Sequence, residues 1–594
     1  MAGWLIVWSR DDSQPDAARW ERSARAAARY GEVAFTEHRR GRIALAAWRR
    51  ESGEFPASGT MAVAAGAQVA WLGQCVEDSG DATAPAMSVV SADQFDAASA
   101  ARLNGPFAAA VVRADPFEVR VVTDRHRHYP VYVHHGRGAT VASTEIRCVI
   151  PWLERADLDA DAVDMLLRCG ELIDRQTLLK GVEMLPPGTV LSDSGQGCAE
   201  RRYWSMRSDG AGEPASPVDQ LAGALKTGVR RLEAVTSHLG ITLSGGLDSR
   251  FILDLCEHPE RVPSFTWGLP GCRDIVCASR FASLVRSPHV VKHWEPEAFP
   301  ALWSRGVDLT GGSCGVDIMY MLPFVPLLAS ACQVVFNGLA GDALLGGNWQ
   351  KSSWLTEHDI EQLGRTVWRW RVPEAQDRLV DRLTARKPGL SSAGERWTAS
   401  IAAREGARPI ERLSDWLVEN RVFRTANCGT MLLRGGVESH APFFDRDFID
   451  VLTRVVADRK FRHRLYLQVM NRAAPRAASV TWQRTNVRPS RGYYANLTAM
   501  AFQRLATQAC KPFGYTPFRD LQVADPAGWL RGPWRKAVDD VILSDSFLHC
   551  GLVNPDVVRE TWRAHLDGAD HSRQISILVA VGLFARLAAG GDNA

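Results

Sequence analysis

A short turn with the sequence SGGLDS, at residues 244–249, is the stretch of this 594-residue chain best suited to chemistry. Its two adjacent glycines have no side chains, so backbone N–H groups can approach a bound anion closely. Two serine hydroxyls add donors, and the single aspartate is an oxygen ligand suited to Mg²⁺. The turn predicts a polyphosphate site with its magnesium ion, and an ordinary tight turn with a helix cap is the alternative. The predicted site comprises Ser244, Gly245, Gly246, Asp248 and Ser249.

The elements around this turn are those of an α/β fold. The apolar run HLGITL predicts a buried strand, and SRFILDLCEH predicts a helix that begins directly after the turn. Upstream, VDQLAGALKTGVRRLEAV carries apolar residues every three to four positions and predicts an amphipathic helix. Because a helix start offers free N–H groups and a favourable dipole, this arrangement would present the turn to an anion.

The rest of the chain divides into two domains. A polar, glycine-containing passage at 205–217 interrupts all periodicity, so we expect one domain over 1–205 and a second over 206–594. The first domain shows short strands and turns, and VRVVTD and YPVYVHH are predicted to be neighbouring antiparallel strands. The second is mostly helical in pattern beyond residue 349. The predicted fold class is a two-domain α/β protein, an antiparallel β sandwich followed by an α/β domain with many helices.

Composition excludes several functions. The formal net charge is only +3, and the basic residues are scattered, so nucleic-acid binding is not expected. Twelve cysteines without a CxxC pair indicate reduced thiols and a cytoplasmic location. The apolar segment 575–589 is short for a bilayer and contains Arg586, so it predicts a buried C-terminal helix and no membrane span. The clustered His126, His128, His134 and His135 are predicted to lie on the surface.

Several further motifs, in the expected order, resemble the asparagine synthetase superfamily. LSGGLDS resembles the pyrophosphate-binding loop of the N-type ATP pyrophosphatases. LNGPFAAAVV and VVTDRHRHYPVYV resemble the N-terminal domain of the superfamily, and FNGLAGDALLGG and VESHAPFFDRDFID resemble its later synthetase motifs. The resemblance implies an amidotransferase-type sandwich and an adenylating domain that splits ATP into AMP and pyrophosphate. A carboxylate would be activated as an acyl-adenylate, which an amine then attacks.

The resemblance also implies roles for individual residues. Asp248 and Asp342 would be the magnesium-linked carboxylates, while Leu243 and Gly338 would lie against the nucleotide. Glu438 is a candidate catalytic carboxylate, with a structural role in the wall between nucleotide and substrate as the alternative. The superfamily carries a lysine in a late basic loop, and in the corresponding stretch of this chain, WQRTNVRPSRGYY, Asn486 stands at that position. The candidate replacement cation is Arg484, with Arg488 and Arg491 nearby and a solvated basic loop as the alternative.

The chain departs from asparagine synthetase at two functional positions. Position 2 is Ala2, where glutamine-hydrolysing members use a cysteine nucleophile, and the Asn-Gly-Glu string that holds glutamine is missing. Leu339 stands where asparagine synthetases carry a glutamate, and a leucine cannot act as a base. The missing N-terminal cysteine, Arg250 after the loop, and the spacing of Asp274 and Ala278 in FTWGLPGCRDIVCASRFA resemble the lasso peptide cyclases. Such enzymes join a peptide's N-terminal amine to an Asp or Glu side chain.

Three readings of the function stay open at this stage. The leading one is ATP- and Mg²⁺-dependent macrolactam formation on a precursor peptide, beside a leader-binding protein and a leader peptidase. The second is a small-molecule amide ligase of the beta-lactam synthetase or asparagine synthetase type. The third is a non-catalytic partner that keeps the fold and has lost turnover.

Overall fold

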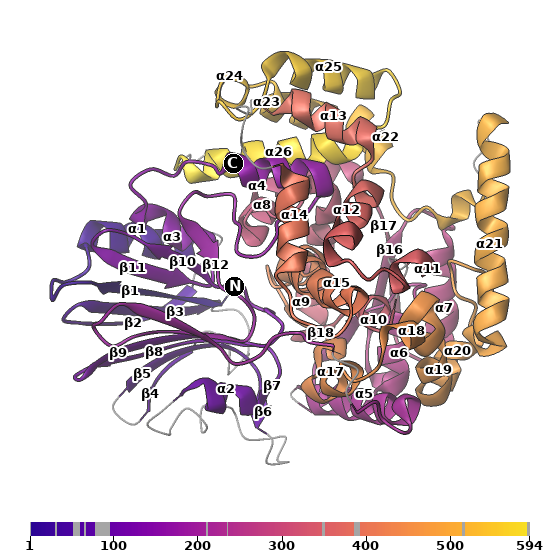
Figure 1. The fold of residues 1–594 in the computed structure, drawn as a ribbon, viewed down its shortest axis with the longest axis horizontal. Coiled ribbons are helices and arrows are strands. Elements are labelled where there is room, and N and C mark those ends of the chain that lie inside the picture. Colours follow the sequence, from indigo (N-terminus) through magenta and orange to yellow (C-terminus); the bar gives the residue numbers. More distant parts are fainter. Residues whose placement is uncertain are drawn as a thin grey trace.

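The computed structural model describes most of the chain and shows two antiparallel sheets followed by a parallel sheet with many helices (Figure 1). The described residues are 2–29, 33–50, 60–64, 67–77, 95–208, 212–234, 236–346, 351–384, 392–513 and 517–590.

The N-terminal domain is a sandwich of two antiparallel sheets, each with six strands in the described ranges. The first sheet has the order β12 (Val182–Met184), β10 (Tyr132–His135), β11 (Ala139–Ser143), β1 (Gly3–Ser9), β3 (Ile43–Arg50) and β2 (Val33–Arg40). The second has the order β14 (Cys198–Arg202), β13 (Thr189–Asp193), β9 (Phe117–Thr123), β8 (Phe107–Ala114), β5 (Ala67–Gly73) and β4 (Thr60–Ala64).

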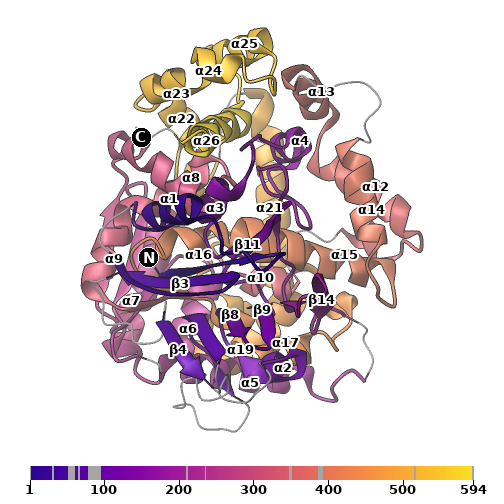
Figure 2. The same ribbon diagram turned by 90° about the vertical axis from the view of Figure 1, so that its left-hand side faces the viewer.

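Strand β1 shows how the first sheet is buried on both faces. Trp4, Ile6 and Trp8 belong to the core between the two sheets. Leu5 and Val7 point the other way, into a core covered by helices α1 (Ala17–Ala27) and α3 (Ile146–Val149). This alternation follows from the two-residue period of a strand. Figure 2 shows both helices lying over the first sheet.

One strand pairing predicted from the sequence is wrong. VRVVTD forms β9 in the second sheet, whereas YPVYVHH contains β10 in the first sheet, so the two strands are not neighbours. The chain between them crosses from one sheet to the other instead of turning back in a hairpin. Asp124 holds this crossing, because its carboxylate accepts hydrogen bonds from the N–H groups of Phe107 and His126 at 3.1 and 2.7 Å.

The C-terminal domain is built around a parallel sheet. Its strand order is β17 (His289–His293), β16 (Ser264–Gly268), β15 (Leu239–Thr242), β18 (Val334–Phe336) and β19 (Glu438–His440). Helices α5 (Pro217–Glu233) and α6 (Asp248–Leu255) flank β15 in the chain, which confirms the helix, strand, turn and helix predicted there. We place the proposed domain boundary between the end of β14 and the start of α5.

Helices make up most of the remaining C-terminal domain, as the sequence predicts. They are α7 (Arg273–Val285), α8 (Trp303–Thr310), α9 (Val325–Ala331), α10 (Gly341–Leu344), α11 (Ser352–Leu355), α12 (Ile360–Arg371), α13 (Glu374–Leu383), α14 (Ala393–Ala402), α15 (Pro409–Leu417), the π-helix η7 (Val418–Ala426), α16 (Cys428–Leu433), α17 (Arg446–Leu452), α18 (Ala457–Lys460), α19 (Arg464–Ala473), α20 (Pro475–Ser479), α21 (Gly492–Cys510), α22 (Pro526–Arg531), α23 (Arg535–Ile542), α24 (Asp545–Leu548), α25 (Pro555–Leu566) and α26 (Ser572–Ala588).

Helix α26 joins the two domains. The helix is buried along most of its length, as its apolar sequence predicts. Ile577 and Phe584 share one core with Leu5 and Leu166 of the N-terminal domain. In Figure 1, α26 runs through the upper part of the molecule, below α25 and beside helix α4 (Ala160–Cys169). Among the residues described, no helix combines the length and apolar character needed to cross a membrane.

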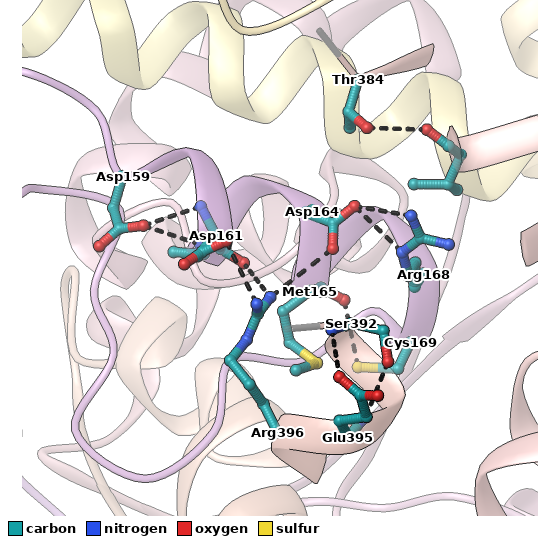
Figure 3. Close-up of polar contacts among 12 residues, drawn as sticks. Asp159, Asp161, Asp164, Met165, Arg168, Cys169, Thr384, Ser392, Glu395 and Arg396 are labelled. Carbon is teal, nitrogen blue, oxygen red and sulfur yellow. Dashed lines mark hydrogen bonds and ion pairs between the residues drawn. The ribbon is translucent and has the colours of Figure 1, made fainter. Parts of the chain in front are cut away.

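A group of ion pairs reinforces the contact between α4 and the C-terminal domain (Figure 3). Arg168 on α4 pairs with Asp164 at 2.9 Å and with Asp381 of α13 at 2.5 Å, and its side chain is only 5% exposed. From α14, Arg396 reaches back to Asp161 at 3.2 Å. The sandwich is thus fixed to the helical part of the molecule by charge as well as by apolar packing.

Candidate active site

The glycine turn lies at the carboxyl edge of the parallel sheet, next to the middle strand. Chain order reverses at β15, because β16 and β17 lie on one side of it while β18 and β19 lie on the other. In open parallel sheets, ligands bind in the crevice outside such a switch point. All strands here run in one direction, so the turns after β15 and β18 meet at this edge.

Hydrogen bonds within the turn hold its two serines side by side. The Ser244 N–H donates to Ser249 Oγ at 2.9 Å, and the two hydroxyl oxygens lie 3.2 Å apart. The Gly246 N–H donates to Ser244 Oγ at 3.2 Å. Helix α6 begins at Asp248 without a side-chain cap, so the N–H groups of its first turn are available to an anion.

Gly245 is the point where two neighbouring segments close on the turn. A Cβ atom at this position would lie 2.7 Å from Asp274 Cα and 3.0 Å from Gln483 Cβ, closer than real side chains approach. Burial raises the pKa of Asp274 to about 6, and a hydrogen bond from the Gly245 N–H opposes that rise. The turn is therefore clamped between helix α7 and the late basic loop.

Two carboxylates, Asp248 of α6 and Asp342 of α10, meet beside the turn. The Asp342 N–H donates to Asp248 Oδ2 at 3.4 Å, and the Tyr466 hydroxyl donates to Asp248 Oδ1 at 2.7 Å. Burial, together with the nearby Asp342 carboxylate, raises the pKa of Asp248 to about 8. Burial also raises the pKa of Asp342, while the Arg484 guanidinium opposes that rise.

This carboxylate pair fits a divalent cation. Two neighbouring carboxylates shielded from water resist ionisation, and a cation between them removes the penalty. Mg²⁺ binds oxygen ligands and in nucleotide sites uses one or two carboxylates together with phosphate oxygens. Asp248 and Asp342 are the residues that would hold it, as the sequence suggested.

The turn after β18 folds around the Asp248 side chain. A Cβ atom at Gly338 would lie 2.8 Å from Asp248 Cβ, and one at Gly341 would lie 2.5 Å from Asp248 Oδ1. Ala340, between them, has a φ of 79°, a left-handed conformation that is rare for residues other than glycine. The structure thus places Gly338 directly against Asp248, and the close approach explains why no larger residue fits.

Of the three arginines considered in the basic loop, Arg484 is the one near the carboxylates. Burial lowers the pKa of Arg484, and the charges of Asp342 and Asp248 raise it, so its guanidinium lies within their electrostatic reach. The guanidinium also lies 5.5 Å from the centre of the Trp482 ring. Arg488 and Arg491 are exposed.

Arg250 fixes the relation between the glycine turn and the basic loop. Its side chain is fully buried, and its Nε donates to the Gly246 carbonyl at 2.7 Å while NH1 donates to the Thr481 carbonyl at 3.1 Å. Sequence reasoning noted this arginine but assigned it no role. A charged residue within the apolar run of α6 is the signal that could have identified it.

Glu438 lies away from this cluster. It begins strand β19, next to Val334 at the amino end of β18, whereas the glycine turn lies at the carboxyl edge. Its Oε1 accepts hydrogen bonds from the Tyr129 hydroxyl at 2.7 Å and from Arg434 Nε at 2.9 Å. The Arg434 charge helps to keep the pKa of Glu438 below its usual range, against the effect of burial. This carboxylate links the two domains at the end of the sheet opposite the glycine turn.

Leu243 and Leu339 flank the turn at different depths. Leu243 is 2% exposed and continues the sheet, since its N–H donates to the Phe265 carbonyl at 2.8 Å. Leu339 is partly exposed, and its N–H donates to Asn337 Oδ1 at 3.0 Å.

The prediction that His126 and His128 lie on the surface is wrong. The two residues are 3% and 2% exposed, because the His126 ring packs against Trp204 and Phe444 between the domains. Together with Asp124 they bring potential metal-ligand atoms within 4.8 Å of one another. The Asp124 oxygens already accept backbone N–H groups, so this carboxylate serves to fix the loop.

Comparison with known proteins finds two family matches along the chain. Residues 220–483 match the family model described as asparagine synthase, and residues 89–204 match the glutamine amidotransferase domain. The two matches follow one another along the chain in the same order as the antiparallel sheets and the parallel sheet of the structure.

Individual relatives are more distant. Proteins from Mycobacterium bovis and Mycobacterium tuberculosis, each named putative asparagine synthetase (glutamine-hydrolyzing), are 25% identical over 265 residues. The match covers 41% of this chain and 40% of each relative, so the chain spans less than half the length of these relatives. The solved glutamine phosphoribosylpyrophosphate amidotransferase from B. subtilis is 12% identical and covers 49% of this chain and 65% of its own, with a TM-score of 0.24. A score this low does not establish a shared fold.

Proposed function

We propose that this protein is an ATP-dependent amide-forming ligase that closes a macrolactam ring in a precursor peptide, as lasso peptide cyclases do. The observation that supports the ligase chemistry is the Asp248 and Asp342 pair beside the glycine turn at the switch point of the sheet. This cluster lies within the segment that matches the asparagine synthase family.

The first proposed step activates an Asp or Glu side chain of the peptide. One carboxylate oxygen attacks the α-phosphorus of ATP, and the bond from that phosphorus to the β-bridging oxygen breaks as pyrophosphate leaves. Ser244, Ser249 and the first N–H groups of α6 hold the leaving pyrophosphate. The Arg484 guanidinium balances negative charge that develops beside Asp342. Mg²⁺, when bound by the two aspartates, neutralises the phosphate oxygens.

The second proposed step forms the amide. The peptide's N-terminal amine attacks the carbonyl carbon of the acyl-adenylate, the bond to AMP breaks, and the amine gives up one proton. The peptide loses one water overall. Because amine and carboxyl belong to one folded peptide, proximity supplies much of the rate. A strong base is then dispensable, in keeping with Leu339 at the edge of the site.

The N-terminal domain supports an amine source other than glutamine. A small cavity of about 70 Å³ lies beside Ala2, between the domains. Its described wall includes Tyr129, Glu145, Arg147 and Glu438 and contains no cysteine. Glutamine hydrolysis by this enzyme family requires a thiol nucleophile, so this domain offers no covalent route to ammonia.

We propose that the protein works in the cytoplasm together with two partner proteins. The precursor peptide would be the substrate, and a leader-binding protein and a leader peptidase would deliver it without its leader. Each of the twelve cysteines is a free thiol, which fits a reducing, cytoplasmic environment.

The test compares two substrates with Mg²⁺ and ATP. A leaderless linear peptide with an Asp or Glu acceptor is expected to yield AMP and pyrophosphate and to lose the mass of one water. Aspartate with ammonia is expected to yield no AMP above background. The Asp342→Asn variant serves as the inactive control, and AMP formed from aspartate and ammonia alone would contradict macrolactam formation.

A small-molecule amide ligase is the second candidate. It is favoured by the relatives named putative asparagine synthetase, which match part of the chain. AMP production from aspartate or a similar small acid, without change in any peptide, would support it. No AMP from either substrate, with correctly folded protein, would favour a non-catalytic partner.

A further inference from the structure

A second, larger cavity lies between the domains, apart from the glycine turn. It has a volume of about 660 Å³, within the range of small-molecule sites. The exit segment of the N-terminal domain forms one wall, and the end of α14 and the start of η7 form another. None of residues 243–249 lines it.

The described wall of this cavity is rich in arginine. Five arginines and three carboxylates line it. Both oxygens of Glu419 are used, Oε1 by Arg202 at 2.7 Å and Oε2 by Arg404 at 2.5 Å. Arg175 pairs with Glu200 at 2.6 Å, and Arg207 pairs with Glu405 at 3.2 Å. Four of the five arginines therefore have a carboxylate partner.

Arg127 is the fifth, and it has no ion pair or side-chain hydrogen bond within the described chain. It is 3% exposed, and its Nε is buried without a partner. Burial lowers the pKa of Arg127 well below its usual value, the nearby Arg424 charge adds to that effect, and Glu419 opposes it. A buried guanidinium without a counter-charge destabilises the folded chain.

The backbone holds Arg127 in this position from both sides. Its φ is 53°, a left-handed conformation that costs energy for a residue with a side chain. The Asp124 carboxylate accepts the N–H groups of His126 and His128 on either side, at 2.7 and 3.2 Å. Asn427 of the C-terminal domain donates to the Arg127 carbonyl at 3.0 Å. The loop is thus fixed in a strained form that carries an uncompensated charge to the cavity wall.

We propose that this cavity binds a small ligand with a carboxylate or phosphate group, and that Arg127 supplies the counter-charge for it. The planar guanidinium matches the two oxygens of a carboxylate or phosphate, and its desolvation strengthens the contact. The five arginines of the described wall outnumber its three carboxylates, which favours an anionic ligand. This site does not depend on the proposed reaction, because it uses none of the nucleotide-site residues.

Calorimetric titration with two probes, sodium glutarate and inorganic phosphate, at constant ionic strength tests the site. Wild type is expected to bind at least one probe, and Arg127→Met is expected to lose about tenfold or more in affinity. Ser244→Ala, in the glycine turn, and Arg378→Met, an exposed arginine on α13 that does not line the cavity, are the matched controls and are expected to keep that binding. Glutarate binding alone assigns a carboxylate ligand, and phosphate binding alone assigns a phosphate.

Two outcomes overturn the proposal. One is the absence of binding of either probe to wild type, and the other is binding that Ser244→Ala loses and Arg127→Met retains. Because Arg127→Met removes an unpaired buried charge, it is expected to melt no lower than wild type without a probe. Wild-type crystals soaked in selenate test the position without any variant. Selenate oxygens within hydrogen-bonding distance of the Arg127 guanidinium support the site, and selenate bound only elsewhere contradicts it.

Discussion

Protonation of Asp248 is expected to differ between the protein without a cation and the protein with bound Mg²⁺. Without a cation, the pKa of Asp248 is about 8, well above its usual value of 3.8. The folded chain therefore binds more protons at this group than the unfolded chain does between those pH values. The stability that this protonation gives is complete below about pH 4 and is lost as the pH rises through the folded pKa. A bound cation would reverse that loss.

The affinity for Mg²⁺ is therefore expected to depend steeply on pH. Below pH 8 the cation must displace a proton from Asp248, so affinity should weaken by up to about tenfold per pH unit between pH 8 and pH 6. Isothermal titration of the nucleotide-free protein at several pH values measures this. Asp248→Asn, which removes one of the two carboxylates that would hold the cation, should weaken Mg²⁺ binding throughout this pH range, and Asp458→Asn, an exposed change on α18, should keep the wild-type profile. A flat pH profile in wild type would show that Asp248 does not titrate against the metal.

Arg484 is expected to be the cation that supports the departing charge. Arg484→Met should lower kcat for AMP formation by about 10²-fold to 10³-fold, because a guanidinium placed beside the reacting phosphate stabilises the transition state. Arg488→Met, four residues further along the same loop at an exposed position, should stay within about twofold of wild type. Initial rates at saturating ATP separate the two variants. Equal losses in both would assign the loop a general electrostatic role.

Residue types and spacing predicted the glycine turn but not the residues that hold it in place. Ser244 and Asp248 belong to the motif SGGLDS, and Asp342 belongs to the motif FNGLAGDALLGG. The structure brings the two aspartates together. Asp274 and Tyr466 complete the cluster from two other places in the chain, and only the fold shows that they meet it. Glu438 illustrates the opposite case, since a carboxylate in a recognisable motif lies at the far end of its strand.

At the scale of elements, close approach between turns decides the geometry of the site. The turn after β18 passes so near to α6 that only glycine fits at Gly338 and Gly341. A displacement of about 1 Å in such a contact can cost about 10²-fold in rate. The two glycines therefore help to position the carboxylates, because they allow the turn after β18 to lie directly against Asp248.

Gly341→Ala is expected to lower AMP formation by about 100-fold or more while the protein stays folded. The reason is that the new Cβ atom would overlap Asp248 Oδ1 and push α10 from α6. Gly223→Ala is the matched control, because a Cβ atom there meets no neighbour and the residue lies within helix α5. The control should be more stable than wild type by about 0.5–1 kcal/mol. Full activity in Gly341→Ala would show that the approach is loose.

The local sequence predicted individual helices and strands better than it predicted which strands pair in a sheet. The strand before the glycine turn, the helix after it and the buried C-terminal helix follow from apolar periodicity alone. Strand β19 has only three residues, too few for a period to show, and it enters the sheet from a remote part of the chain. The chain between β9 and β10 contains no glycine turn, and that absence could have indicated that the strands occupy different sheets.

At the scale of the whole molecule, the two domains behave as one packed unit. A single core includes residues from β1, α4 and α26, and the ion pairs of Arg168 lie at its edge. The cavity beside Ala2 and the cavity beside Arg127 both depend on this contact, because their walls come from both domains.

Arg168→Ala is expected to weaken the joint between α4 and α13. It removes one partner of a nearly buried ion-pair group, which costs about 3 kcal/mol in comparable cases. The first unfolding transition in urea, followed by circular dichroism, should move to lower concentration. Arg378→Ala, on the same helix α13, removes an exposed pair with Glu374 and should cost less than about 0.5 kcal/mol. Equal effects of the two variants would mean that Arg168 does not hold the domains together.

The most direct test of the proposed reaction follows one oxygen atom. A linear peptide labelled with ¹⁸O in its acceptor carboxyl group is incubated with Mg²⁺ and ATP, and the nucleotide products are analysed by mass spectrometry. Adenylation predicts that one labelled oxygen appears in AMP as the peptide loses one water. Label in inorganic phosphate, with ADP as the nucleotide product, or unlabelled AMP beside a closed ring, would contradict carboxylate adenylation at this site.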